Sequence, residues 1–339
     1  MDKKSIDNIV WYIPLKKLRD AIRDYMLRDY KNCISPWDID AIIDFRKSIR
    51  NDDNFIEKYK KLISNLDDES IKTINYILKY ILEYKNIDDK VIFSDKESSI
   101  LEKILEEHFF NIIKINDQCF IYDKYLLPSN HFNINVFYYK NGINNIKNLQ
   151  KIKSKNIIDA GGYIGDSAIV LADYTDKKVY SFEPFKQHYE IMLKTINLNS
   201  NTNIIPVNMA LGDKNKSLDI FSDGEIKGSH SLETTFSNEN NSKNKIEMIT
   251  LDQFVEEKNI EVGLIKTDLE VFEQPFLNGA INTIKKYKPV LLISIYHSYS
   301  DFFEIKPMIE ALDLGYSFKI LKIKEPSLIG ETILIAEIE

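Results

Sequence analysis

The chain has 339 residues, of which 44% are hydrophobic and 29% are charged, and its formal net charge at pH 7 is -7. This length exceeds that of an average single domain, so we expect two domains, each with its own hydrophobic core. Broad binding to nucleic acid or to an anionic membrane needs a clustered positive surface, which the acidic composition argues against. We therefore expect no nucleic-acid partner.

The sequence also argues against a disulfide-bonded or zinc-binding protein, a secreted protein and a membrane-spanning protein. Neither Cys33 nor Cys119 has a partner at metal-ligand spacing, so we expect no disulfide framework and no zinc site. Residues 1–18 carry charges and Pro14 in place of the apolar stretch of a signal peptide. The longest apolar run, residues 290–295, is far shorter than the roughly 20 residues of a membrane-spanning helix. A cytoplasmic protein without a membrane span is expected.

The first 110 residues contain no glycine and predict a helical N-terminal domain. Ser35 and Pro36 supply an N-cap and a first-turn proline for one helix, and Ser94 with Glu97 has the spacing of a capping box for another. Between them, six apolar residues recur at helical spacing and predict a buried helix face: Ile71, Ile74, Ile77, Leu78, Ile81 and Leu82. We expect this domain, residues 1–110, to act as a helical cap or as the contact of a homo-oligomer.

Residues 111–154 predict a hairpin and a linker, because two short strand patterns flank the turn residues Asn116 and Asp117 within residues 114–122. After residue 155, short apolar runs alternate with helical patterns, which is typical of a parallel α/β sheet. The predicted strands are residues 157–158, 179–182, 204–209, 264–265 and 290–295, and the predicted helices are residues 167–174, 188–198 and 275–287. Residues 238–244, rich in asparagine and serine, predict a loop.

The end of the chain follows a different pattern. Residues 317–323 and 332–338 have strand patterns with Pro326 and Gly330 between them and no helix. We therefore expect an antiparallel hairpin that closes the edge of the sheet. This ending favours a methyltransferase topology over a nicotinamide-binding one.

A glycine-rich segment, residues 159–166, lies between a predicted strand and a predicted helix. Glycines at such a turn let the backbone bend sharply and approach a ligand closely, although a plain structural turn uses the same residues. Glu183 ends the next predicted strand, near the spacing of roughly 20 residues at which an acid binds ribose hydroxyls. We therefore expect a nucleoside ligand, held by Glu183 and by Gly161, Gly162, Tyr163, Gly165, Asp166 and Ser167.

The carboxylates of this segment favour one nucleoside. A dinucleotide places its diphosphate at a helix N-terminus, where Asp166 would repel it. Asp159 and Asp166 instead suit the ammonium and sulfonium groups of S-adenosylmethionine, which carries no phosphate. We expect S-adenosylmethionine as the cofactor, with two alternatives open: Asp166 as a helix cap, and Asp159 as an acceptor of loop N–H groups.

Four motifs in this order resemble those of the FkbM-type S-adenosylmethionine-dependent methyltransferases. The first family motif, Asp-x-Gly-x-x-x-Gly-Asp, is matched by Asp159, Gly161, Gly165 and Asp166. Residues 182–184 resemble the ribose-binding Phe-Glu-Pro, residues 210–213 resemble the motif near adenine, and residues 266–270 resemble the start of Lys-x-Asp-x-Glu-Gly-x-Glu. The resemblance adds Pro184 and Ala210 to the expected cofactor contacts. It implies a Rossmann-like class I methyltransferase domain over residues 155–339 and O-methylation of a small molecule or glycan.

The sequence departs from the family pattern at two places. Val271 stands where the signature has glycine, although Glu273 is retained, and Gly162 with Tyr163 stands where many members have Ala-Asn. We therefore expect a differently shaped turn after the fourth strand of the sheet.

Candidate catalytic residues follow two of the predicted strands. Asp268 and Glu270 are two residues apart, so an extended chain places them on one face, where they supply a general base, share a divalent metal or remain solvated acids. Asp268 is also an expected cofactor contact. His297 either acts as a general base or positions the acceptor, or it bonds a neighbouring carbonyl. Glu273 and Asp252 have the positions of residues that stabilise helix starts.

The leading prediction is therefore methyl transfer from S-adenosylmethionine to a hydroxyl of a saccharide or small metabolite. One alternative is a catalytically silent, methyltransferase-like interaction module in a glycan-assembly complex. A nicotinamide-dependent oxidoreductase is disfavoured by Asp166 and by the terminal hairpin.

Overall fold

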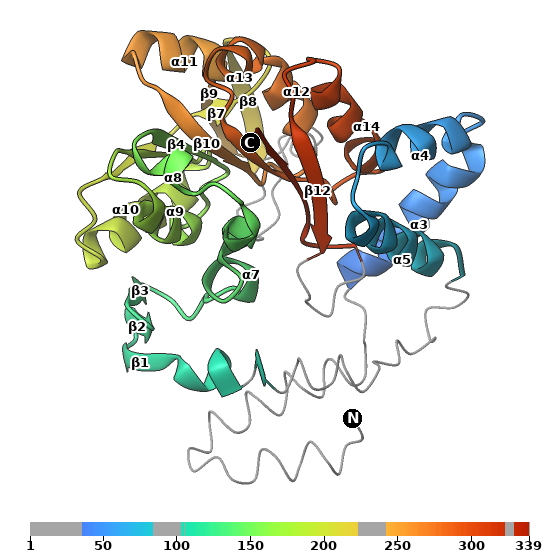
Figure 1. The fold of residues 1–339 in the computed structure, drawn as a ribbon. Coiled ribbons are helices and arrows are strands. Elements are labelled where there is room, and N and C mark those ends of the chain that lie inside the picture. Colours follow the sequence, from blue (N-terminus) through green and yellow to red (C-terminus); the bar gives the residue numbers. More distant parts are fainter. Residues whose placement is uncertain (1–35, 84–102, 105, 223–241, 323–328, 339) are drawn as a thin grey trace, which may run out of the picture.

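A seven-stranded, mostly parallel sheet lies at the centre of the molecule (Figure 1). The computed structural model describes residues 36–83, 103–104, 106–222, 242–322 and 329–338. In the spatial order β12-β13-β11-β10-β4-β5-β6, the strands are β12 (Ser317–Lys322), β13 (Thr332–Glu337), β11 (Val290–Ser294), β10 (Val262–Thr267), β4 (Asn156–Ala160), β5 (Val179–Phe182) and β6 (Ile204–Val207).

Strands β11, β10, β4, β5 and β6 pair in parallel, whereas β13 pairs antiparallel with both β11 and β12. Every residue of β10 and β11 is buried, as expected for central strands that are covered on both faces. The predicted fold class, a mostly parallel α/β sheet with a C-terminal antiparallel hairpin and a helical N-terminal region, is confirmed.

Alternate residues of the strands pack into two different hydrophobic clusters. Ile158 and Ile265 belong to one cluster and Ile157 and Leu264 to the other, because successive side chains of a strand point to opposite faces. The first face is covered by α11 (Leu251–Lys258), α12 (Glu273–Asn278), α13 (Ile281–Tyr287) and α14 (Tyr299–Glu310). The second is covered by α7 (Ile134–Phe137), α8 (Gln150–Lys153) and α9 (Asp166–Leu171).

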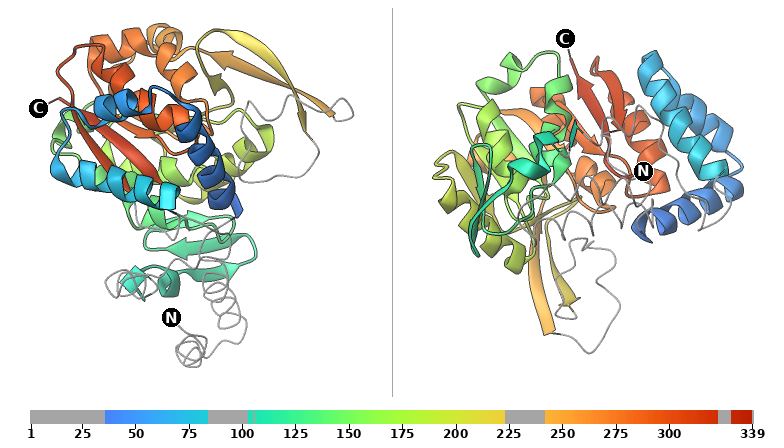
Figure 2. Two further views of the ribbon diagram at one scale, coloured as in Figure 1. Left: turned by 90° about the vertical axis from the view of Figure 1, so that its right-hand side faces the viewer. Right: turned by 90° about the horizontal axis from the view of Figure 1, so that it is seen from below.

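Three N-terminal helices pack beside the C-terminal strands (Figures 1 and 2). They are α3 (Pro36–Asn51), α4 (Phe55–Ile63) and α5 (Asp68–Glu83). Ser70 Oγ accepts a hydrogen bond of 2.9 Å from the Ile320 N–H, and Lys58 Nζ lies 2.9 Å from Glu304 Oε1. Their apolar side chains join the same cluster as α11–α14.

The predicted buried stripe of α5 is confirmed at its centre and wrong at its end. Ile74, Ile77, Leu78 and Ile81 are buried, whereas Leu82 is exposed. In the last turn of the helix, Ile81 therefore faces the core and Leu82 faces solvent.

The segment between the helices and the sheet carries the predicted hairpin, which pairs β1 (Ile113–Asn116) with β2 (Cys119–Tyr122). A third strand, β3 (Tyr125–Leu127), pairs with β2 and was not predicted. The 3-10 helix η2 (Lys140–Asn145) follows α7. This segment brings asparagine side chains to the edge of the central sheet.

A second small sheet, with β7 (Ala210–Leu211), β8 (Lys216–Ser222) and β9 (Ser242–Ile249), follows β6. Figure 2 shows that β8 and β9 project from the body of the molecule. The loop predicted at residues 238–244 is wrong for residues 242–244, because their backbone pairs with β8.

The single helix predicted for residues 275–287 is wrong, since α12 and α13 are separate helices. Gly279 ends α12, and its carbonyl accepts a hydrogen bond from the Asp252 N–H. The Asp252 carboxylate then accepts bonds of 3.0 and 2.7 Å from the N–H groups of Asn282 and Thr283, at the start of α13. A residue distant in sequence therefore supplies the cap that divides the helix.

Several predictions concern residues outside the described part of the chain: Cys33, Ser35 and the capping box of Ser94 and Glu97. None of the helices in the described ranges is long and apolar enough to cross a membrane.

Candidate functional site

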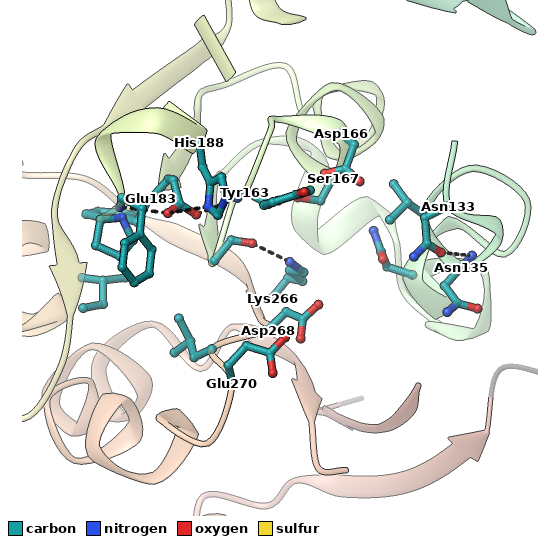
Figure 3. Close-up of a pocket in the computed structure, with 18 of the residues that line it drawn as sticks. Asn133, Asn135, Tyr163, Asp166, Ser167, Glu183, His188, Lys266, Asp268 and Glu270 are labelled. Atoms are coloured by element: carbon teal, nitrogen blue, oxygen red, sulfur yellow. Dashed lines mark hydrogen bonds and ion pairs between the residues drawn. The ribbon is translucent and has the colours of Figure 1, made fainter. Parts of the chain in front are cut away.

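A cavity of about 290 Å³ lies where β4, β5 and β10 end. Open α/β sheets bind ligands at this edge, beyond the carboxyl ends of their strands. Figure 3 shows polar side chains from several elements around the cavity. The predicted site residues that line it are Gly161, Tyr163, Asp166, Ser167, Glu183, Pro184, Ala210, Asp268 and Glu270.

The glycine-rich loop turns between β4 and α9, directly below the cavity. Gly161 has a φ of +84°, and a Cβ at this position would lie 2.0 Å from the carbonyl oxygen of Asp268. Only glycine fits there, because any side chain would force the β4 and β10 loops apart. Gly162 and Gly165 do not line the cavity. They are instead tightly packed against neighbouring side chains. A Cβ added to Gly162 would lie 2.1 Å from Ser181 Oγ, and one added to Gly165 would lie 2.9 Å from Met192 Cγ.

Asp159 lies beneath the loop and does not line the cavity. Its carboxylate is fully buried, accepts hydrogen bonds of 2.9 and 2.7 Å from the hydroxyls of Ser167 and Ser181, and pairs with Lys266 Nζ at 3.2 Å. Its partners are thus hydroxyls and an ammonium, and not the loop N–H groups of the alternative considered above. The structure places Asp159 as a support of the loop.

Lys266 lines the cavity and connects two of its walls, although sequence analysis assigned it no role. Its ammonium donates to the carbonyl of Gly161 at 3.0 Å and pairs with Asp159. Burial lowers the pKa of Lys266, but the carboxylates of Asp159, Asp268 and Asp166 outweigh this effect and raise it. Lys266 therefore stays charged, and Asp159 compensates that charge.

Asp166 is the first residue of α9, and Gly165 occupies the N-cap position. The alternative of Asp166 as the N-cap is therefore wrong. Its side chain lines the cavity, and burial raises its pKa. Asp166 therefore presents a carboxyl group to the cavity at the start of the helix.

Glu183 is held rigidly at the end of β5. One of its oxygens accepts a hydrogen bond of 3.0 Å from the Tyr163 N–H, and the other accepts one of 2.9 Å from the Phe185 N–H. Glu183 Oε1 also lies 3.6 Å from His188 Nδ1, so Oε2 is the oxygen that keeps a further lone pair for a ligand hydroxyl. The Tyr163 ring lies between the rings of His131 and His188, at centroid distances of 5.4 and 4.6 Å, and forms an aromatic wall.

Asp268 and Glu270 converge with His297 at the opposite wall. The ring Nε2 of His297 lies 3.2 Å from Asp268 Oδ1 and 3.7 Å from Glu270 Oε2, and its Nδ1 lies 3.0 Å from Glu273 Oε1. The side chains of Asp268 and Glu270 are 38% and 32% exposed, whereas that of His297 is 1% exposed. The carboxylates can therefore reach a ligand, and the buried imidazole cannot.

The pKa values of His297, Glu270 and Asp268 are shifted in different ways, which gives each residue a different protonation state. Burial would lower the pKa of His297, but Glu273 and Asp268 raise it well above its usual value, so the ring is an imidazolium without a free lone pair. Burial raises the pKa of Glu270 to about 7, with His297 opposing the shift. Burial would also raise the pKa of Asp268, but hydrogen bonding to His297 and the charge of Lys266 lower it. This arrangement favours Glu270 as the proton acceptor and His297 as a positioning residue.

Asp268, Glu273 and His297 also form a group whose polar atoms lie within 4.8 Å of one another. Such a group is compatible with a metal ion, but it holds Glu273 and His297 with Asp268 and does not include Glu270, which the open alternative paired with Asp268. In the described structure, however, the His297 imidazolium already supplies positive charge between the carboxylates. We assign no metal ligand.

The turn after β10 keeps a glycine-like conformation without glycine. Val271, which replaces the family's glycine, has a φ of +79°, and Glu270 has a φ of +50°. A positive φ is a genuine outlier for a β-branched residue. The turn that presents Glu270 to the cavity is therefore strained.

Val271→Gly is expected to raise the free energy of unfolding by about 1 kcal/mol. A left-handed conformation costs a residue with a Cβ about 1–2 kcal/mol, and the greater freedom of glycine in the unfolded chain offsets about 0.5–1 kcal/mol of this gain. Urea unfolding measures the change. Val271→Ala, which keeps a Cβ, is the control and should gain little. A Val271→Gly protein less stable than wild type would contradict the assigned strain.

The segment before the sheet contributes residues that sequence analysis missed. His131, Asn133, Asn135 and Asn141 line the cavity from α7 and its flanking turns. No motif marks them, and only the packing of α7 on α9 brings them to the site. His230, which was assigned no role, lies outside the described residues.

Residues 159–318 match the family described as the methyltransferase FkbM domain. The fold is similar to that of a methyltransferase FkbM from Methylobacillus flagellatus KT, with a TM-score of 0.55 and 18% sequence identity, over 86% of this chain and 60% of that one. The chain thus spans about three fifths of that protein's length. An rRNA methylase from Streptococcus thermophilus shows a lower TM-score of 0.36 at 14% identity, over 56% of this chain and 92% of that one. No curated protein matches the chain.

Proposed function

We propose, on the match of residues 159–318 to the methyltransferase FkbM domain, that the chain is an S-adenosylmethionine-dependent O-methyltransferase. The acceptor is a hydroxyl of a saccharide or a small metabolite. The observation that carries the proposal is Glu270, a cavity-lining carboxylate whose pKa is raised to about 7. A group with this pKa accepts a proton efficiently near neutral pH.

The charges that line the cavity fit the donor. Asp166, Glu183, Asp268, Glu270 and Glu331 line it, and the one lysine among the lining residues is paired with Asp159. An acidic cavity stabilises a sulfonium and an ammonium and repels a diphosphate. The cavity therefore favours S-adenosylmethionine over a nicotinamide dinucleotide.

The chain offers a contact for each part of the donor. Ala210 and Pro184 lie where the family resemblance places adenine and ribose, Glu183 accepts from the ribose hydroxyls, and Asp166 faces the ammonium. When bound, S-adenosylmethionine supplies an electrophilic methyl group on a positively charged sulfur. The loop from Gly161 to Ser167, held by Lys266 and Asp159, keeps these contacts in a fixed arrangement.

The residues at the opposite wall bind and deprotonate the acceptor. Glu270 removes the one proton of the acceptor hydroxyl, and Asp268 stays ionised beside His297. The imidazolium of His297 orients both carboxylates. Alignment of the oxygen with the methyl group supplies much of the rate enhancement, because displacement at carbon needs an in-line approach.

The proposal includes three parts of the chain in a cytoplasmic protein. They are a helical domain at residues 1–110, a hairpin and linker at residues 111–154, and the methyltransferase domain at residues 155–339.

Ile43, Ile56 and Leu82 are exposed on α3, α4 and α5 among the described residues. We propose that a second copy of the chain covers these side chains in a homo-oligomer. Light scattering after gel filtration tests this contact, and a monomer at all concentrations would reject it.

Glu183→Ala is expected to raise the Kd for S-adenosylhomocysteine by about 10- to 100-fold, because hydrogen bonds to a carboxylate contribute about 1.5–3 kcal/mol. Titration calorimetry measures the loss against wild-type binding in the micromolar range or tighter. Glu190→Ala, an exposed glutamate on the neighbouring helix α10 (Lys186–Leu198), is the control. Equal affinity in all three proteins would reject the assigned pocket.

Turnover separates an enzyme from a silent interaction module. Purified protein, labelled methyl donor and a glycan and metabolite extract should give labelled product in which the methyl group resists mild alkaline hydrolysis, as an ether does and an ester does not. Donor binding without labelled product from any extract would favour the silent module.

A further inference from the structure

Two buried amide groups line the cavity without a hydrogen-bond partner. Asn135 is 2% exposed, and neither its Nδ2 nor its Oδ1 makes a hydrogen bond. Asn141 Nδ2 is also buried and has no acceptor. Both side chains line the cavity. Because buried polar groups in native proteins are almost always paired, these amides point to a ligand that pairs them.

The fold holds Asn135 in this position. Asn133 is the N-cap of α7, and its Oδ1 accepts a hydrogen bond of 2.7 Å from the Asn135 N–H. The other residues of this short helix are all buried and apolar. The Asn135 amide is therefore the only polar side chain in an apolar turn, and its direction is set by the packing around it.

The position of Asn135 indicates which part of the proposed donor it contacts. Figure 3 shows Asn135 across the cavity from Glu183, with Asp166 and Lys266 between them. A nucleoside whose ribose binds Glu183 would extend its other end toward Asn135. In S-adenosylmethionine that end is an α-amino acid, which carries a carboxylate and an ammonium.

The chemistry of the amides matches this end of the donor. Five acidic side chains of the described part of the chain line the cavity, so a further carboxylate needs hydrogen-bond donors that carry no negative charge. The Nδ2 groups of Asn135 and Asn141 are such donors, and Asn135 Oδ1 is an acceptor for the ammonium. A carboxylate and an ammonium together therefore satisfy all three orphaned atoms.

We propose that Asn135 and Asn141 form the subsite for the amino-acid end of the methyl donor. Their Nδ2 groups donate to the α-carboxylate, and Asn135 Oδ1 accepts from the α-ammonium beside Asp166. This inference rests on the proposed function, because it requires S-adenosylmethionine in the cavity. It assigns the donor's specificity to a segment that lies outside the matched methyltransferase domain.

The test compares two ligands that differ only at this end. S-Adenosylhomocysteine carries the amino acid, whereas 5′-methylthioadenosine has a methyl group in its place. Asn135→Ala is expected to raise the Kd for S-adenosylhomocysteine by about 10- to 100-fold, as for the loss of hydrogen bonds to charged groups. The Kd for methylthioadenosine should change by less than about twofold. Asn141→Ala should show the same selectivity with a smaller loss.

Two further variants keep the test interpretable. Asn135→Leu keeps a side chain branched at Cγ in case the smaller alanine side chain destabilises α7, and it should show the same ligand selectivity. Asn144→Ala changes an exposed asparagine in η2 that does not line the cavity, and it should bind both ligands as wild type does. Thermal unfolding without ligand should give Asn135→Leu a Tm equal to or above that of wild type, because the variant removes unpaired buried atoms.

Three results would overturn the inference. Equal losses for both ligands, with a lower Tm, would show that the amides only support the fold. Unchanged Kd values with a raised KM for the acceptor would assign the amides to the acceptor. Wild-type protein that binds neither ligand would reject the proposed function itself, and with it this subsite.

Discussion

Glu270→Gln is expected to lower kcat by about 10²- to 10⁴-fold, the usual contribution of a general base. The amide keeps the size of the carboxylate but cannot accept the acceptor's proton. The Kd for S-adenosylhomocysteine should stay within about threefold of wild type, because the base acts on the acceptor. Steady-state kinetics and calorimetry measure the two quantities separately.

The pH dependence gives an independent test of the same residue. Since Glu270 must be deprotonated to act, the wild-type kcat/KM should rise with pH and level off above the pKa of about 7. Glu270→Gln should lose this rise. Glu256→Gln, an exposed glutamate of α11, should keep both the rate and the pH profile. A Glu270→Gln enzyme with wild-type kcat would assign the proton transfer elsewhere, with Asp268 as the next candidate.

Lys266→Met is expected to lower the free energy of unfolding by about 3–5 kcal/mol, because it leaves the buried carboxylate of Asp159 without a compensating charge. The loss of the bond from Lys266 Nζ to the Gly161 carbonyl also frees the glycine-rich loop. Donor affinity should therefore fall together with stability. Denaturant unfolding and calorimetry measure the two effects.

The double variant Asp159→Asn/Lys266→Met separates charge from packing. It removes both charges and should recover most of the lost stability, because neutral groups of similar size replace a buried ion pair at little cost. Lys285→Met, an exposed lysine of α13, is the control and should change stability by less than about 0.5 kcal/mol. A double variant as unstable as Lys266→Met would show that the ion pair is not the cause.

The supporting ion pair explains why motif residues can matter without touching a ligand. Asp159 leads the first motif, but its carboxylate contacts Ser167, Ser181 and Lys266. Asp159 and Lys266 thus hold the loop with opposite charges that compensate each other. Asp166 and Glu183, in contrast, line the cavity, and they are the residues that the proposed function assigns to the ligand.

Features that depend on neighbouring residues were predictable from the sequence. The alternation of apolar runs and helices predicted the sheet, because period and length depend on local side-chain placement. Glycines at a strand-to-helix turn predicted the loop, and two strand patterns without a helix between them predicted the hairpin of β12 and β13. The absence of glycine at residue 271 suggested a differently shaped turn, and the sequence did not predict that Val271 itself would adopt a positive φ.

Features that depend on distant contacts were decided by the tertiary structure. Asp252 divides α12 from α13 by capping the second helix, and the burial of His297 among Asp268, Glu270 and Glu273 makes it a cation and not a base. Asn135 carries no sequence signal, yet the packing of α7 places its amide in the cavity. Sequence patterns record which residues share a face of one element, but burial and charge depend on which faces meet, and that is settled only when the chain has folded.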